Sequence, residues 1–132
     1  MLFRSSGHFV EGDDPEPFGE KNMSQEEAVD RIQEFLKAPP TLSAIPKETP
    51  LSQLRVRHGG YDIRGALLDH NVAFPIERMK ELENEEVIGS LTPDLYSFVG
   101  ACAQTRLLKQ QGPQWKDTLI EHEVDVAFLV PI

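Results

Sequence analysis

The chain has 132 residues, of which 22 are acidic and 13 are Lys or Arg, so its formal net charge is −9. This balance argues against a surface that binds nucleic acid or an anionic membrane, although it is compatible with a local basic pocket. The single cysteine, Cys102, excludes an internal disulfide framework and a multi-cysteine metal site. The length suits a single domain over residues 1–132. Because the sequence shows neither a secretory signal nor a long apolar run, we expect a cytoplasmic protein.

The N-terminal part is predicted to hold a strand, a loop and a helix. Residues 1–10 favour the end of a strand followed by a loop. In that loop, His8 is either an exposed residue or a polar group at the carboxyl end of the strand. Ser24 and Glu27 form a capping box, which predicts an amphipathic helix over residues 25–37.

The centre of the chain holds its densest run of chemically capable side chains. Four prolines between residues 38 and 53 indicate an ordered linker or crossover rather than a helix. Residues 54–56 favour a short strand, which runs into the polar, glycine-bearing turn HGGYD at residues 58–62. Ligands of α/β proteins usually bind where a strand ends in a loop, so we expect a site at this turn.

The C-terminal half alternates predicted helices and strands. We expect a helix that begins at Pro75, with Ile76, Met79 and Leu82 on its apolar face, and then strands over residues 87–91 and from Tyr96. A helix over residues 103–111 should be broken at Gly112-Pro113. A further helix should run from Pro113 to about Glu123, with Trp115, Leu119 and Ile120 on one face, and a strand should follow over residues 124–130. The last strand is continuously apolar, which is typical of parallel sheets covered on both faces. The sequence therefore predicts an α/β fold, a Rossmann-like layered sheet with mostly parallel strands and flanking helices.

The strongest chemical candidates lie in and around the HGGYD turn. Asp62 can hydrogen-bond an imidazole nitrogen of His58 and raise its basicity, as in general acid–base and metal-ligating sites. The alternative is that Asp62 caps backbone amides while His58 is a polar residue of the loop. Arg55, Arg57 and Arg64 flank the turn, and they either bind a substrate carboxylate or pair with acids of the chain itself.

Two further positions also carry two interpretations each. Asn71, with His70 beside it, is either a second polar part of the site or a turn-forming residue. Cys102 is either a nucleophile whose thiol pKa is lowered at a helix N-terminus or a small buried residue.

Several segments together resemble the selenoprotein B family, which comprises the selenoprotein subunits of the glycine, sarcosine, betaine and D-proline reductases. The likeness covers residues 54–132 and is carried by segments 58–62, 71–79, 88–90 and 124–127, with a weaker likeness at Gly7-His8. The HGGYD and FPI-x-R-M stretches are most similar to the D-proline reductase subunit.

The resemblance implies a reductase subunit that cleaves a C–N bond of an amino acid or its derivative. In that family a selenocysteine or cysteine attacks the α-carbon of a substrate held as an imine-type adduct on the pyruvoyl group of a partner subunit. An electron-donor protein is a further implied partner. The implied nucleophile follows directly after Ile132, at a UGA codon in the selenocysteine case, and Cys102 does not match its position. Residues 1–132 would then be an incomplete N-terminal portion, inactive by itself.

The resemblance and the local chemistry together define the candidate pocket. Its residues are His8, His58, Gly59, Gly60, Tyr61, Asp62, Arg64 and Asn71. We expect no metal and no cofactor in this chain under this interpretation. Two alternatives remain, namely a non-catalytic partner-binding or regulatory α/β domain, and a hydrolase that uses His58 and Asp62 with a metal.

Overall fold

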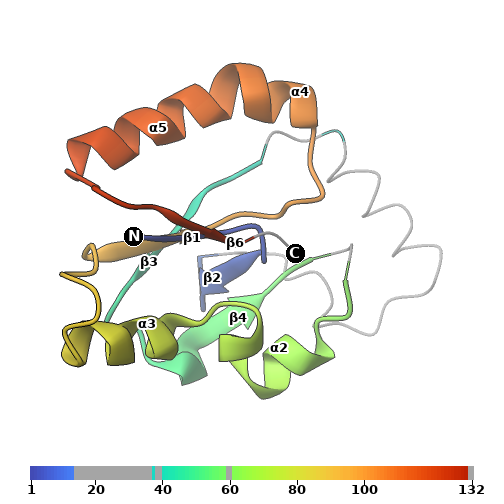
Figure 1. Cartoon of the computed structure of the whole chain (residues 1–132). Coiled ribbons are helices and arrows are strands. Elements are labelled where there is room, and N and C mark those ends of the chain that lie inside the picture. The colour runs from blue at the N-terminus through green and yellow to red at the C-terminus, as the bar shows by residue number, and fades with distance from the viewer. Residues whose placement is uncertain (14–36, 38–39, 59–60, 131–132) are drawn as a thin grey trace.

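The computed structural model describes residues 1–13, 37, 40–58 and 61–130. Except for Lys37, the helix expected over residues 25–37 lies outside this part of the chain, as do Gly59 and Gly60 of the HGGYD turn. The described elements form layers: a four-stranded sheet lies between a long C-terminal helix on one face and shorter helices with a two-stranded sheet on the other (Figure 1).

The four-stranded sheet is built mostly from parallel strands, in the order β3-β5-β1-β6. Its strands are β1 (Leu2–Arg4), β3 (Ser43–Pro46), β5 (Asp94–Ser97) and β6 (Phe128–Val130). β1 pairs in parallel with both β5 and β6, whereas β3 is an antiparallel edge strand. Arg4 pairs with Ser97 on one side and with Val130 on the other, so the carboxyl ends of three strands meet at one edge. The predicted α/β class with mostly parallel strands is confirmed.

A two-stranded antiparallel sheet lies beside this edge. It consists of β2 (His8–Val10) and β4 (Leu54–Val56), so the strand predicted at residues 54–56 is confirmed. Gly7 turns the chain from β1 into β2 with a φ of 70°, a left-handed conformation that favours glycine. The Gly7 N–H donates to the carbonyl of Phe98, and the Gly7 carbonyl accepts from the N–H of Arg57.

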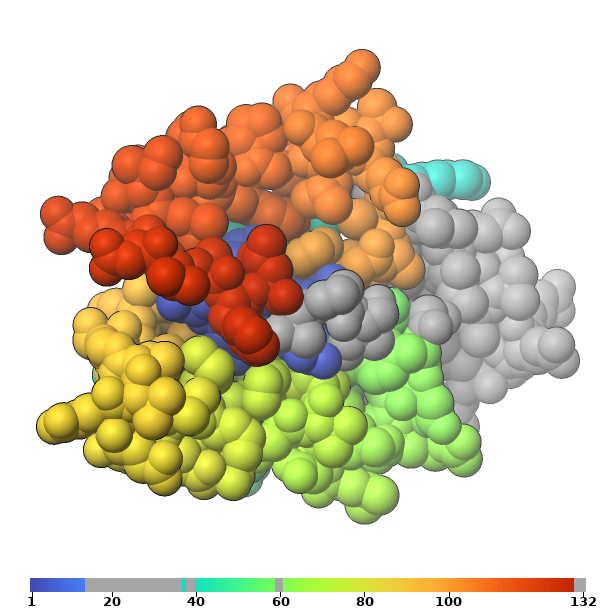
Figure 2. Space-filling model, viewed as in Figure 1, coloured from blue at the N-terminus to red at the C-terminus, as the bar shows by residue number. Residues whose placement is uncertain are grey.

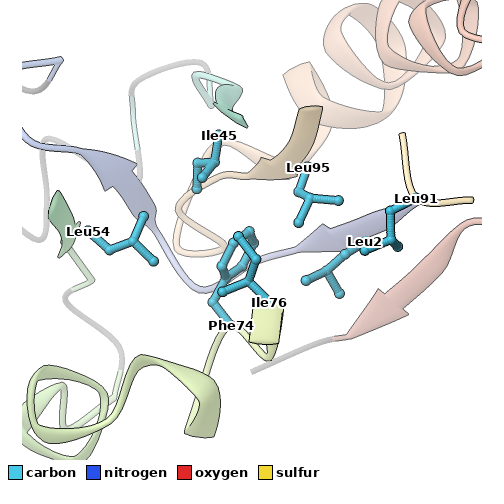
Figure 3. Close-up of a cluster of buried hydrophobic side chains, with 7 residues drawn as sticks. All are labelled: Leu2, Ile45, Leu54, Phe74, Ile76, Leu91 and Leu95. Atoms are coloured by element: carbon cyan, nitrogen blue, oxygen red, sulfur yellow. The ribbon is translucent and has the colours of Figure 1, made fainter. Parts of the chain in front are cut away.

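A buried apolar cluster joins the two sheets. Its members are Leu2, Ile45, Leu54, Phe74, Ile76, Leu91 and Leu95. Their side chains converge from both sheets, from the start of the helix that begins at Ile76 and from connecting segments (Figure 3). The opposite face of the four-stranded sheet carries a second cluster of Met1, Phe3 and Tyr96. Leu2 and Phe3 therefore face opposite layers, as successive residues of a strand do.

The helix predicted from Pro75 is confirmed as α3 (Ile76–Asn84), which starts immediately after that proline. Ile76 is buried, and Met79 packs against the apolar cluster between the sheets. Two short elements precede α3, namely α2 (Arg64–Leu68) and the single 3-10 turn η2 (His70–Val72). Together they bring the residues that follow the HGGYD turn back against β4.

The C-terminal helix is continuous where a break was expected at Gly112-Pro113. α4 (Gln104–Arg106) runs through the π-helical turn η3 (Leu107–Gln111) into α5 (Gly112–Glu121). The wide turn accommodates the proline. Pro113 has no N–H to donate, and just before it the Gly112 N–H donates to the carbonyl of Leu107, five residues earlier, so the helix continues. Trp115 and Leu119 pack on the sheet as predicted.

Other local predictions were wrong. Ile120 is exposed, and residues 87–91 form no strand. The proline-rich segment before β4 contains strand β3 and the 3-10 turn η1 (Leu51–Gln53), with Pro46 ending an edge strand as proline can. β6 is shorter than expected and is an edge strand whose Phe128 and Leu129 are exposed. Figure 2 shows this segment at the surface, between the α5 side and the α3 side of the molecule.

Among the helices in the described ranges, none has the length and apolar character needed to cross a membrane.

Candidate functional site

Polar side chains gather where β1 and β5 reach their carboxyl ends. Arg4 ends β1 and Ser97 ends β5, while Ser6 and His8 flank Gly7, which turns the chain from β1 into β2. All four residues are buried: Arg4 is 7% exposed and the other three are 0% exposed. Buried polar groups are costly unless they are paired, so a concentration of them at a strand end marks a candidate site.

His8 is the centre of a hydrogen-bonded chain. Its Nδ1 lies 2.8 Å from the Ser6 Oγ and its Nε2 lies 3.2 Å from the Nδ1 of His70. The backbone N–H of His8 donates to the Ser97 Oγ over 2.9 Å, and the Ser6 and Ser97 hydroxyls are 3.3 Å apart. The His8 ring also stacks on Phe74 of the apolar cluster, with ring centroids 5.2 Å apart. These hydrogen bonds connect the buried residues at the sheet edge to His70, which is only half-buried.

Burial keeps both histidines neutral. Burial first, and then the nearby His70 and Arg4, together lower the pKa of His8 to about 3. The pKa of His70 is also lowered, by burial first and then by the charge of Arg55, while Asp69 acts in the opposite direction. A neutral imidazole donates from one nitrogen and accepts at the other, as the His70–His8–Ser6 chain requires.

Tyr61 connects the HGGYD turn to this edge. Its hydroxyl donates to the carbonyl of Ser6 over 3.1 Å, and its ring centroid lies 4.7 Å from that of His58. Burial raises the pKa of Tyr61 to about 12 and lowers that of His58, so both are neutral near pH 7. Of the predicted pocket residues, the structure therefore brings His8, His58 and Tyr61 together.

Asp62 and Arg64 pair with each other instead of forming the site. The Arg64 Nε donates to both carboxylate oxygens of Asp62, at 2.9 and 3.0 Å, the Arg64 Nη2 donates to Oδ2 at 2.5 Å, and the Arg64 backbone N–H adds a fourth bond at 3.0 Å. These bonds lower the pKa of Asp62 to about 2. Asp62 thus accepts a hydrogen bond from a backbone amide, and the Asp62–His58 hydrogen bond that the sequence analysis considered is not formed.

The other predicted polar residues are also explained by local structure. Asn71 caps α3: its Oδ1 accepts from the Glu77 N–H over 3.0 Å, and its Nδ2 donates to the Glu77 carboxylate over 3.1 Å. Arg55 pairs with Glu11 over 2.7 Å. Cys102 is buried, and burial raises the pKa of its thiol, which is the opposite of what a nucleophilic cysteine requires.

Sequence reasoning missed Arg4, Ser6 and Ser97. Arg4 and Ser97 each end a short strand, and Ser6 lies two residues after β1; these positions are the signal that points to them. Arg4 is the least usual, because its Nε is buried without a hydrogen-bond partner among the described residues. The described part of the chain holds no group of three His, Cys, Asp or Glu side chains arranged to bind a metal ion.

The family model for glycine/sarcosine/betaine reductase selenoprotein B matches residues 45–131. The chain belongs to this family. The matched stretch contains His58, Tyr61, His70 and Ser97, whereas β1 and β2 precede it.

Curated relatives agree with this family assignment. The D-proline reductase subunit gamma of Acetoanaerobium sticklandii is 34% identical over 86 residues, which are 64% of this chain and 36% of that protein. The glycine reductase complex component B subunit gamma of Symbiobacterium thermophilum is 35% identical over 72 residues, 54% of this chain and 17% of that protein. The sarcosine reductase complex component B subunit beta of Peptoclostridium acidaminophilum is also 35% identical over 72 residues, 54% of this chain and 16% of that protein. The chain thus spans about a third or less of the length of these relatives. No solved structure matches the chain.

Proposed function

We propose that the chain is part of a selenocysteine- or cysteine-dependent reductase subunit that cleaves the C–N bond of an amino acid or its derivative. The main support for this proposal is the match of residues 45–131 to the selenoprotein B family. The relatives are named as subunits or components of D-proline, glycine and sarcosine reductases, which supports a role inside a multi-subunit complex.

The sheet topology supports a position for the nucleophile. β6 is parallel to β1, and its last residue, Val130, is in register with Arg4. A chain that continues from β6 therefore emerges at the edge that holds Arg4, Ser97 and the His8–Ser6 pair. We place the selenocysteine or cysteine there, directly after Ile132, where the resemblance puts it. A selenolate or thiolate is a strong nucleophile at neutral pH, as attack on carbon requires.

The overall reaction sets what the partners must contribute. For D-proline, breaking the bond between nitrogen and the α-carbon with two electrons and two protons gives 5-aminopentanoate. The two electrons come from a dithiol, which becomes a disulfide; an electron-donor protein supplies this dithiol in the complex, and dithiothreitol can replace it in an assay. The pyruvoyl group of a partner subunit activates the substrate nitrogen as a leaving group. This chain contributes the buried polar edge that receives the rest of the substrate.

The DNA sequence after the Ile132 codon tests the proposal first. The expected result is a UGA or cysteine codon followed directly by an open reading frame. The extended chain, with cysteine in the position of selenocysteine, is then combined with the pyruvoyl-bearing subunit and dithiothreitol, and the conversion of D-proline, glycine, sarcosine and betaine is measured. The same extended chain with serine in that position is the matched control. A closed frame, or equal turnover by the cysteine and serine versions, would refute the catalytic assignment.

A non-catalytic partner-binding domain is the second candidate, and the surface of β6 favours it. Val126, Phe128 and Leu129 are 72%, 51% and 65% exposed, and β6 is an edge strand of the sheet. Edge strands with apolar side chains tend to pair with another chain. If the extended chain binds the pyruvoyl-bearing subunit but supports no turnover of any of the four substrates, this second function replaces the first.

A further inference from the structure

We propose that Arg4 is an anion-binding residue, and that the anion it holds is the carboxylate of a small amino-acid substrate. The choice of a carboxylate rests on the proposed function, since glycine, sarcosine, betaine and D-proline all carry one. The presence of an anion site rests on the structure around Arg4 alone.

The first argument is burial without a partner. Arg4 is 7% exposed, and its Nε has no hydrogen-bond partner in the described part of the chain. Other arginines there have acidic partners: Arg55 lies 2.7 Å from Glu11, and Arg78 lies 2.8 Å from Glu81. A buried guanidinium is ordinarily paired, because removing a charge from water is costly unless an opposite charge compensates for it. An anionic ligand provides that compensation.

The second argument is the charge of the groups around Arg4. Tyr61 and His8 both interact electrostatically with Arg4, and both are neutral near pH 7. Neither offers the negative charge that a guanidinium needs. Arg4 is therefore a buried positive charge that neither of these neighbours neutralises, which favours an anion over a neutral or cationic ligand.

The third argument is the position of Arg4. It ends the central strand of the parallel set, in register with Ser97 of β5 and Val130 of β6. This is the edge at which α/β proteins bind ligands. It is also where we place the nucleophile, so a carboxylate on Arg4 would hold the adjacent α-carbon near the attacking atom. The planar fork of a guanidinium binds a carboxylate through two parallel hydrogen bonds, which fixes its orientation as well as its location.

The test measures binding by the 132-residue chain, so it needs neither the nucleophile nor a partner subunit. Acetate, glycine and D-proline are titrated by calorimetry and by thermal denaturation at constant ionic strength, with chloride replacing the anion. Pyrrolidine, which has the ring of D-proline without the carboxylate, is the matched control ligand. We expect saturable binding of D-proline and a rise in melting temperature, with no response to pyrrolidine.

Variants of Arg4 separate a binding role from a structural one. Arg4→Met removes the charge but keeps an unbranched, flexible side chain. Arg4→Lys keeps the charge without the fork, and Arg78→Met is the matched control at an exposed arginine. We expect Arg4→Met to weaken carboxylate binding by about tenfold or more, from the loss of charge-assisted hydrogen bonds. Arg4→Lys should retain part of the affinity, and Arg78→Met should bind like the original chain.

A structural arginine would give the opposite pattern. Without ligand, Arg4→Met should melt at the same temperature as the original chain or higher, because it removes an uncompensated buried charge. If Arg4→Met unfolds at a clearly lower temperature and the original chain ignores every carboxylate, Arg4 pairs with an acid of the chain and the inference is wrong. If inorganic phosphate binds and the carboxylates do not, the carboxylate assignment is wrong.

The outcome is also separable from that of the proposed function. Carboxylate binding that depends on Arg4, in a protein whose extended form has no reductase activity, would support this inference and remove the proposed function. Conversely, an active reductase whose KM and kcat for D-proline are unchanged in Arg4→Met would remove this inference and leave the function standing.

Discussion

The protonation of His8 gives a quantitative prediction about stability. His8 is fully buried in the folded chain with a pKa of about 3, whereas an exposed histidine titrates near 6.5. As the pH falls below about 6.5, the unfolded chain binds a proton at His8 and the folded chain does not. Stability is therefore lost as the pH falls from about 6.5 towards 3, and is unaffected by His8 above that range.

The size of the effect follows from the two pKa values of His8. Between about pH 7.5 and about pH 5, the unfolded histidine becomes almost fully protonated while the folded one stays neutral, which destabilises the fold by about 2 kcal/mol. The loss reaches about 4 kcal/mol at pH 3 and levels off near about 5 kcal/mol at lower pH, where the folded form also binds the proton. His58 and His70 also have lowered pKa values, so their effects have the same sign.

Comparison of the chain with its His8→Asn variant isolates the contribution of His8. Asparagine keeps a polar atom near the position of Nδ1 but does not titrate, so its cost in stability is the same at both pH values. Urea unfolding at the two pH values should show that the original chain loses about 2 kcal/mol more than the variant. His122→Asn, at an exposed histidine beyond the end of α5, is the matched control and should behave like the original chain. Equal pH dependence in His8→Asn and the original chain would refute the reasoning.

Three further substitutions test the packing that positions the site, each measured by urea or thermal unfolding. Gly7→Ala should cost about 2 kcal/mol or more, because φ is 70° and an added Cβ would collide with the backbone carbonyl of Arg57, whereas Gly89→Ala, where a Cβ meets nothing within 4 Å, should be nearly neutral. Phe74→Ala should cost about 3–5 kcal/mol, since this fully buried ring joins the apolar cluster to the His8 ring, and a loss below about 1 kcal/mol would contradict the described core. Asn71→Ala should cost about 1 kcal/mol through loss of the cap of α3, and an unchanged midpoint would show that the cap contributes nothing.

The sequence predicted correctly those helices and strands that are specified by their own neighbouring residues. β4 and α3 were found because the alternating apolar, polar and apolar residues at 54–56 and a proline-led amphipathic stretch each specify their own structure. The interruption at Gly112-Pro113 was misjudged, because a π-helical turn satisfies the same residues without ending the helix. β3 was missed because its Pro46 is compatible with an edge strand, and edge position is not visible in the sequence.

Only part of the site could be predicted, for a related reason. His8, His58 and Tyr61 were identified by residue type and by their place near strand ends, and they do lie together. Asp62 was misleading because Arg64, two residues later, forms a stronger local pair than His58 can. Arg4 escaped notice because arginine is rarely buried and because its pairing with Ser97 joins residues 93 positions apart, a register that the sequence pattern does not specify.

The family match begins at Ile45, yet the sheet that carries the site depends on residues before it. β5 and β6 both lie in the matched stretch, but they do not pair with each other; each pairs with β1. β1 is therefore the strand that sets the distance and register between the end of β5 and the end of β6. Because Arg4 ends that strand, the residue proposed to hold the substrate and the strand proposed to lead to the nucleophile are fixed relative to each other by backbone hydrogen bonds. Rigid positioning of this kind is what an attack on a bound carbon atom requires.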